Sequence, residues 1–281
     1  MLNDIASTPT LGHRETRFLP ENGFLEQSSA RALYRLALWT IATLLAAAAL
    51  LVAAAPAVPQ FMAAQQPAIA ASAQRHCVPP TWLAAVLYNE MLGTEDRWLH
   101  CLLPGEDSWS QTLREGLLGL HFLTVKRVWW NLKALADLAG ADTTLGPACL
   151  RVSVGREIRA EVPVTGGAYQ AQGLWERPSL IGDLSDPATA IEYLAANLAR
   201  GQRRLAPADR GDWAASARWQ NTGLLYRRPE VPAPLWEKGS RYVTQVEAFL
   251  PRAVAWLPAP EEATATPPDA LASRLTLLGP N

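Results

Sequence analysis

A run of 23 residues without a charged side chain, from Leu36 to Val58, places the strongest constraint on how this chain can fold. At about 1.5 Å of rise per residue, a helix of this length crosses the hydrocarbon core of a bilayer. The run is preceded by 35 residues, more than the n-region of a cleaved signal peptide usually holds. We therefore predict a transmembrane helix over residues 34–58, with cleavage near "AAAPA" as the alternative.

Basic residues flank this span on one side only. Arg14, Arg17, Arg31 and Arg35 precede it, whereas the next Lys or Arg is Arg75. Because basic residues are retained on the cytoplasmic side of a membrane, the pattern predicts a cytoplasmic N-terminus. The rest of the chain is then extracytoplasmic, in the periplasm of a single-pass inner-membrane protein.

All three cysteines follow the span, at positions 77, 101 and 149. Disulfides persist in extracytoplasmic compartments. A bond between Cys77 and Cys101 would tie the start of a helix to the loop after it and leave Cys149 as a free thiol. The sequence leaves open whether this bond forms.

The charge balance and the histidine spacing exclude several classes of partner. A formal net charge of −1, with 18% charged residues, is not that of a basic nucleic-acid binder. His76, His100 and His121 lack metal-ligand spacing, and no HExxH, CxxC or Gly-rich phosphate loop occurs. We expect no nucleic acid, no metal and no cofactor.

Composition divides the chain around the span. Residues 1–33 read as a flexible cytoplasmic tail, 59–70 as a linker, and 258–281 as a Pro/Ala-rich tail. The remaining residues, 71–257, are enough for one domain.

Helical patterns dominate this domain, so we predict a mainly α fold. N-cap residues, Pro at first-turn positions and apolar periodicity predict helices near residues 79–92, 108–139 (with a possible break), 153–161, 186–205, 212–220 and 240–257 (with a kink at Pro251). Only "AEVPV", residues 160–164, resembles a strand.

One carboxylate lies on the apolar side of the first of these helices, "VPPTWLAAVLYNEML". Leu83, Val86, Leu87 and Glu90 occupy the i, i+3, i+4 and i+7 positions of one stripe. A carboxyl buried without a partner tends to keep its proton, which raises its pKa and lets it donate to a leaving oxygen. The alternative is that Glu90, near a helix end, points into water or pairs with Arg97.

Two later segments add to this pattern: "TLGPACL" (144–150), a Gly-Pro turn before a helix, and "WQNTG" (219–223), a helix end. With "VPPTWLAAVLYNE" before them and "DPATAIEYLAANL" between them, the sequence resembles the lytic transglycosylases of the lysozyme-like superfamily over about residues 70–250. The resemblance implies a lysozyme-like α-helical domain. It also implies that Glu90 is the general acid/base that cleaves the MurNAc-GlcNAc β-1,4 bond of peptidoglycan.

In that family the C6 hydroxyl of the substrate attacks the anomeric carbon, so one carboxylate suffices; attack by water, which takes a second carboxylate, remains open here. The substrate-binding residues that the resemblance implies are Gly146, Pro147, Cys149, Trp219, Gln220, Asn221 and Tyr226. Three positions depart from the family, with Met91 in place of Ser, Cys149 in place of Gln, and Gln220 in place of Tyr. Trp219 or Tyr226 could replace the missing Tyr.

The remaining polar and aromatic residues have simpler expected roles. We expect solvated loop positions for four acids, Glu95, Asp96, Glu106 and Asp107. We expect packing roles for Tyr88, Asn89, Trp175 and Tyr242, and core, glycan or lipid contacts for Trp129 and Trp130. "EDRWLH", residues 95–100, also resembles a short motif of the peptidoglycan glycosyltransferases.

Two other functions remain open. The domain could be a catalytically inactive glycan-binding or scaffolding component of an envelope assembly. It could also be a membrane-anchored adaptor whose helix at 108–139 binds an envelope protein. The sequence specifies neither the oligomeric state nor the cell-wall process.

Overall fold

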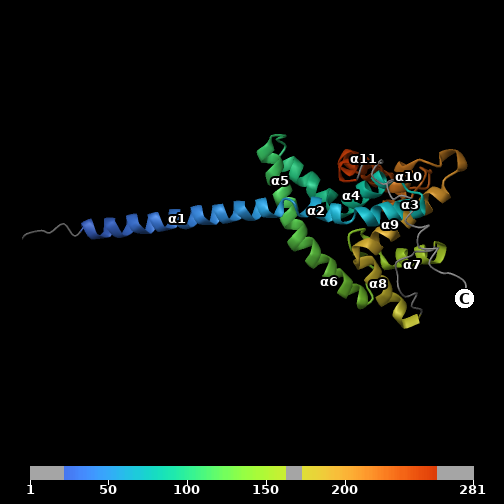
Figure 1. Ribbon diagram of the computed structural model, residues 1–281, viewed down its shortest axis with the longest axis horizontal. Coiled ribbons are helices and arrows are strands. Elements are labelled where there is room, and N and C mark those ends of the chain that lie inside the picture. Colours follow the sequence, from blue (N-terminus) through green and yellow to red (C-terminus); the bar gives the residue numbers. More distant parts are fainter. Residues whose placement is uncertain (1–21, 163–172, 258–281) are drawn as a thin grey trace, which may run out of the picture. The chain divides into compact units, whose positions relative to one another are not determined.

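The computed structural model describes residues 22–162 and 173–257, and it is mainly helical, as the sequence predicts (Figure 1). The α-helices are α1 (Asn22–Ala54), α2 (Ala57–Ala64), α3 (Gln66–His76), α4 (Pro80–Leu102), α5 (Ser108–His121), α6 (Arg127–Leu138), α7 (Val152–Glu161), α8 (Glu176–Ser185), α9 (Pro187–Arg204), α10 (Trp213–Thr222) and α11 (Ala233–Trp256). Shorter elements are the π-helical η1 (Phe122–Lys126), the 3-10 turns η2 (Gly173–Trp175) and η3 (Pro207–Asp209), and the strands β1 (Thr144–Leu145) and β2 (Leu150–Arg151). The predicted tail at 258–281 lies outside the described residues.

The predicted membrane span is helical. Helix α1 contributes to a helical stretch near the N-terminus that is long and apolar enough to cross a membrane, with a mean hydropathy of 2.3 over an 18-residue window. No Pro or Gly occurs between Gly23 and Pro56. Helix α1 accordingly begins at Asn22, inside the segment predicted to be a flexible tail.

The chain forms two compact units, residues 1–49 and 50–281. The segment predicted to be a linker, residues 59–70, is helical, because α2 and α3 occupy it and meet at Gln65. Val58, Met62 and Ile69 from these helices are buried in the hydrophobic core. The second unit therefore includes about 20 residues that composition alone assigned to the span and linker.

The core of the second unit is built around α4 and α9. Helix α4 packs against α11, α9, α3 and α5, and α9 packs against α10, α3 and α8. As predicted, Asp186 caps α9 by accepting a hydrogen bond from the backbone N–H of Thr189 (2.9 Å), and Pro187 occupies the first turn. Asp212 caps α10 in the same way, and Gly223 ends α10 with φ 71°.

Helix α4 is longer than predicted, because it continues for twelve residues beyond Glu90 to Leu102. The Cys77–Cys101 disulfide, which the sequence leaves open, does not form. The two cysteines are free and exposed near opposite ends of this 23-residue helix. A helix of that length spans about 34 Å, whereas a disulfide needs Cα atoms within about 7 Å.

The predicted helix at 108–139 is present, and its break is a π-helical turn. Helices α5 and α6 join through η1, and Gly140 follows with φ 106°. Farther along, the Gly-Pro turn lies in a hairpin in which β1 pairs antiparallel with β2, and α7 follows. The strand expected at 160–164 is not seen, since 160–161 end α7 and 163–164 lie outside the described residues. Helix α11 includes Pro251 and runs on to Trp256.

Candidate active site

Glu90 lies where two hollows of the second unit share their lining. The larger hollow, of about 520 Å³, extends over the β1–β2 hairpin, α7, α9 and α10, and the smaller one, of about 350 Å³, lies between α4 and α11. Glu90, Asn221 and Lys238 line both of them. An extended ligand lying across the two hollows would pass over the Glu90 carboxyl.

The surroundings of Glu90 favour its protonated form. Burial raises the pKa of the Glu90 carboxyl to about 7, against hydrogen bonds from Tyr242 and Gln220 and the charges of Lys126 and Lys238, which lower it. The Tyr242 hydroxyl donates to Oε1 of Glu90 at 2.5 Å. A carboxyl with this pKa holds a proton in a large fraction of molecules at neutral pH, so it can act as a general acid.

Glu90 is neither a solvated surface residue nor the ion-pair partner of Arg97, the alternatives that the sequence leaves open. The Arg97 guanidinium donates from Nε to the backbone oxygen of Gly93 (2.9 Å), one turn away on α4. Glu90 instead lies in the middle of α4 and bonds to α11 through Tyr242.

Tyr242 is a site residue that the sequence does not single out, because the sequence predicts a packing role for it. It is buried, and burial and the adjacent Glu90 raise the pKa of its phenol well above the ordinary value, so the hydroxyl keeps the proton that it donates. The signal that could have identified Tyr242 is the one that identified Glu90, a polar group on a buried face of a helix. Val246 and Phe249 lie on the same face of α11. A tyrosine on such a face is too common to select by itself.

Tyr226, one of the two candidates to replace the family's Tyr, makes its hydrogen bonds away from Glu90. Its hydroxyl donates to Oδ2 of Asp209 (3.0 Å) and accepts from the backbone N–H of Ala206 (2.7 Å), which anchors the segment after α10. Trp219 lines the larger hollow, and the Arg204 guanidinium lies 4.7 Å from the centre of its ring.

The hairpin turn places a thiol beside Glu90. The Cys149 Sγ lies 3.3 Å from the backbone oxygen of Glu90, and Cys149 has φ 48°. Burial, with Glu90 next in importance, raises the pKa of this thiol to about 12, so it stays neutral and is a poor nucleophile. Gly146 and Pro147 are buried in the turn and do not line either hollow around Glu90.

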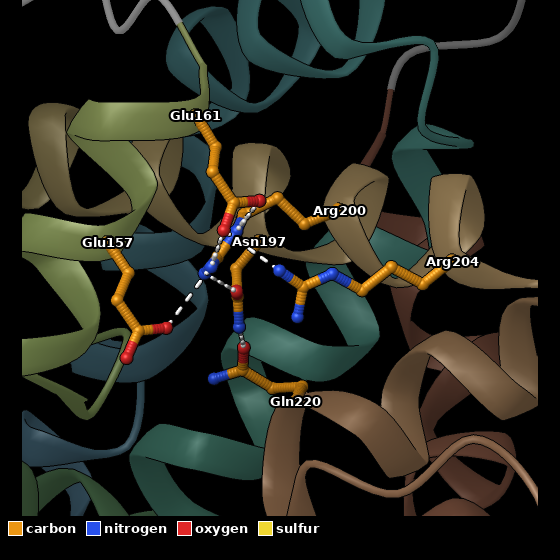
Figure 2. A network of polar contacts seen from close by, with 6 residues as sticks. All are labelled: Glu157, Glu161, Asn197, Arg200, Arg204 and Gln220. Atoms are coloured by element: carbon orange, nitrogen blue, oxygen red, sulfur yellow. Dashed lines mark hydrogen bonds and ion pairs between the residues drawn. The ribbon is translucent and has the colours of Figure 1, made fainter.

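A chain of polar contacts orients the Gln220 amide (Figure 2). Gln220 Oε1 accepts from Nδ2 of Asn197 (2.5 Å), and Asn197 Oδ1 accepts from Arg200 (3.0 Å). Since the Gln220 oxygen is occupied, its NH₂ group is the end available to donate toward Glu90. Arg200 is 1% exposed.

Two carboxylates of α7 hold Arg200 in place. Its guanidinium donates to both oxygens of Glu161 (2.9 and 2.7 Å) and to Glu157 (3.1 Å). Glu157 is a second carboxylate that lines the larger hollow, and sequence reasoning did not select it. It lies 67 positions after Glu90, on a helix whose placement the sequence pattern does not specify.

Of the four acids expected in a solvated loop, Glu106 and Asp107 are exposed in the loop between α4 and α5, whereas Glu95 and Asp96 lie on α4. Asp96 is buried on α4 and pairs with Arg252 (2.8 Å), and Glu95, also on α4, pairs with Lys126 (2.8 Å). Asp107 is the N-cap of α5, and Glu106 is exposed. Within residues 22–162 and 173–257, no group of three or more His, Cys, Asp or Glu side chains is arranged to hold a metal ion.

Replacing Tyr242 by Phe is expected to raise the pKa of Glu90, because it removes a hydrogen bond that stabilises the carboxylate. The loss of one bond to a charged group corresponds to about one pH unit. An NMR titration of the side-chain carboxyl measures this shift. The control is Tyr226→Phe, which removes a hydroxyl remote from Glu90. An unchanged Glu90 pKa in Tyr242→Phe contradicts the assigned contact.

Comparison of this chain with protein-family models, with curated proteins and with solved structures finds no match.

Proposed function

We propose that this chain is a membrane-anchored glycosidase of the lytic transglycosylase type, which cleaves the MurNAc-GlcNAc β-1,4 bond with Glu90 as its single general acid/base. The observation that carries the proposal is a carboxyl with a raised pKa where two hollows meet, held by Tyr242 and Gln220. The proposal includes a lysozyme-like arrangement of the helices around Glu90.

The lining of the hollows supports a polar ligand such as a glycan. Asn221 lines both hollows, and its Oδ1 atom has no hydrogen-bond partner among the described residues. A buried amide oxygen without a partner is costly. A sugar hydroxyl or amide N–H in the cleft would satisfy it. Trp219 adds an indole surface, and indoles pack against apolar faces such as those of sugar rings.

In the proposed reaction, protonated Glu90 donates its proton to the glycosidic oxygen as the bond from that oxygen to C1 breaks. The GlcNAc side leaves as an alcohol, and the MurNAc ring carries oxocarbenium character. Tyr242 and Gln220 then donate hydrogen bonds to the Glu90 carboxylate. This carboxylate accepts the proton of the C6 hydroxyl as the C6 oxygen bonds to C1, which yields the 1,6-anhydro product and restores the acid.

The three departures from the family pattern are compatible with this role. Met91 is fully buried, so the residue after Glu90 points into the core and not into the cleft. Gln220 supplies an amide donor where the family has Tyr, and Tyr242 on α11 supplies a phenol. Cys149 contributes a neutral thiol beside the backbone of Glu90.

Product analysis tests the proposal. Full-length protein in detergent is incubated with purified sacculi, and the soluble products are separated and identified by mass spectrometry. The full chain is used because α2 and α3 contribute to the core. The proposal predicts anhydro-muropeptides that are absent with Glu90→Gln. Glycan binding without products would favour the scaffolding alternative.

Replacing Glu157 by Gln separates the one-carboxylate mechanism from hydrolysis by a water that a second carboxylate activates. We expect the cleavage rate of Glu157→Gln to stay within a few-fold of that of the wild type, since Glu161 still holds Arg200. The rate of anhydro-muropeptide release measures this. A loss as large as that of Glu90→Gln would show that two carboxylates are needed.

The proposed location is the inner membrane, with a cytoplasmic N-terminus and an extracytoplasmic catalytic domain. The apolar helix near the N-terminus supports the anchor, and the basic residues before it support the orientation. Peptidoglycan strands lie on the extracytoplasmic side, where this orientation places Glu90.

A further inference from the structure

Helix α5, η1 and α6 follow one another as a single helical arm, residues 108–138, drawn in green in Figure 1. We call it the apolar arm, because it exposes many large apolar side chains, between 41% and 69% of each. They are Trp109, Leu123, Val125, Val128, Trp129, Leu132, Leu135 and Leu138. Apolar surface of this extent usually has an occupant in the working protein.

Four of these side chains form one face of α6. At about 100° per residue, Val128, Trp129, Leu132 and Leu135 fall within an arc of about 120°. The opposite side of α6 packs onto the rest of the second unit, through partly buried Trp130 and fully buried Asp137. The apolar face is therefore turned away from the core of its own unit.

The charged residues of the arm near this face are all basic. From residue 116 to residue 136 the sequence contains no Asp or Glu, whereas Arg127 and Lys133 are basic. Lys126 is basic too, but it pairs with Glu95 of α4. Arg127 is exposed, and the Lys133 ammonium lies 5.7 Å from the centre of the Trp129 ring. An apolar face bordered by basic residues and containing Trp is typical of helices that lie in the surface of an anionic bilayer.

The arm is also packed against the end of α1. Gly116 and Gly119 of α5 lie so close to the backbone of Leu51 and Ala54 that a Cβ atom would come within 2.6 Å and 1.8 Å of the two carbonyl oxygens. Leu51 and Ala54 belong to the second unit and lie in the last turn of α1. The contact joins the arm to the part of α1 that belongs to the second unit, directly after the first unit in the sequence.

We propose that the apolar arm lies in the surface of the membrane that anchors α1, with the α6 face among the acyl chains and its basic residues among anionic headgroups. This inference rests on the membrane anchor stated under Proposed function and does not depend on glycan cleavage. It would hold the catalytic domain against the membrane surface at two points, the span and the arm.

Spin labels measure the depth of the arm. Full-length protein, with Cys77 and Cys101 replaced by Ser, is reconstituted in phosphatidylethanolamine–phosphatidylglycerol vesicles. The third thiol, Cys149, has its pKa raised to about 12 by burial and resists labelling. Nitroxides are attached in separate variants to Leu132→Cys, to Leu45→Cys in α1, and to Glu247→Cys on the exposed side of α11. A nitroxide that collides mainly with oxygen lies in lipid, and a nitroxide that collides mainly with a water-soluble nickel chelate lies in water.

The proposal predicts that the labels at 132 and 45 are accessible to oxygen and protected from nickel, and that the label at 247 shows the reverse. Nickel access at 132 with lipid access at 45 would overturn the proposal for the arm and leave the anchor standing. Spin–spin broadening at 132 would show that a second copy of the chain covers the face, and this also overturns it. Nickel access at both 45 and 132 would refute the anchor and the arm together.

Discussion

Glu90→Gln is expected to lower the rate of glycan cleavage by about 10²- to 10⁴-fold, the usual contribution of a general acid. Gln has nearly the shape of Glu and can still accept the hydrogen bond of Tyr242. It has no acidic proton to give to the glycosidic oxygen. The rate of release of soluble products from labelled sacculi, at equal protein concentration, measures the loss.

The same variant carries its own control for folding, because its stability is expected to rise. The folded state holds the Glu90 proton up to pH about 7, whereas the unfolded chain releases it near the ordinary value of 4.5. Wild-type stability therefore falls as pH rises from about 4.5 to about 7, and Glu90→Gln lacks this loss. Denaturant unfolding should show the variant more stable at pH 8 and equal to the wild type near pH 4.5. A less stable variant at pH 8 would contradict the raised pKa.

Gly146→Ala is expected to lower the free energy of unfolding by about 2 to 5 kcal/mol. Gly146 has φ 58°, a left-handed conformation that costs a residue with a side chain about 1 to 2 kcal/mol. A Cβ at this position would lie 1.9 Å from the Leu184 backbone oxygen, and relief of such a clash adds about 1 to 3 kcal/mol. Cleavage should also decline, because the turn places Cys149 beside Glu90.

The matched control is Gly182→Ala, on the exposed side of α8. A Cβ at Gly182 meets no atom within 4 Å, and Gly182 is inside a helix. Alanine there should stabilise the protein by up to about 1 kcal/mol. The two substitutions are thus expected to change the free energy of unfolding in opposite directions. Equal losses at both positions would show that Gly146 is not under the strain assigned to it.

Local signals explain the parts of the fold that the sequence predicts well. Asp186 before Pro187 predicts the start of α9, and Asp212 predicts the start of α10, because capping depends on neighbours within one turn. Glu90 is also identified by a local signal, because it lies on the apolar stripe of one helix. These signals need no knowledge of what packs against the helix.

The errors arise where contacts distant in sequence decide the structure. Helices α2 and α3 are short and contain Pro59 and Pro67, so their sequence resembles a linker until Met62 and Ile69 are seen in the core. The predicted end of α4 near Gly93 was wrong, because α4 continues through this glycine to Leu102. Gly93 has no Cβ, and this leaves space for the Asn89 side chain. The same expected helix end placed Cys101 in a loop, which is why a bond to Cys77 stayed open in the sequence.

The candidate site was predicted only in part for the same reason. The contact between Glu90 and Tyr242 joins residues 152 positions apart, and it depends on the packing of α4 against α11. Gln220 was selected by resemblance, but its orientation depends on Asn197 and Arg200, which only the packing of α9 and α10 brings together.

The central claim is that Glu90 keeps a proton at neutral pH in a cleft open to a ligand. A carbon-13 NMR titration of the Glu90 carboxyl in the full-length protein tests it most directly, with Glu90→Gln used to assign the resonance. The account predicts a pKa near 7, the value to which burial raises it. A titration near the ordinary value of 4.5 would mean that Glu90 is ionised at neutral pH and cannot serve as the acid.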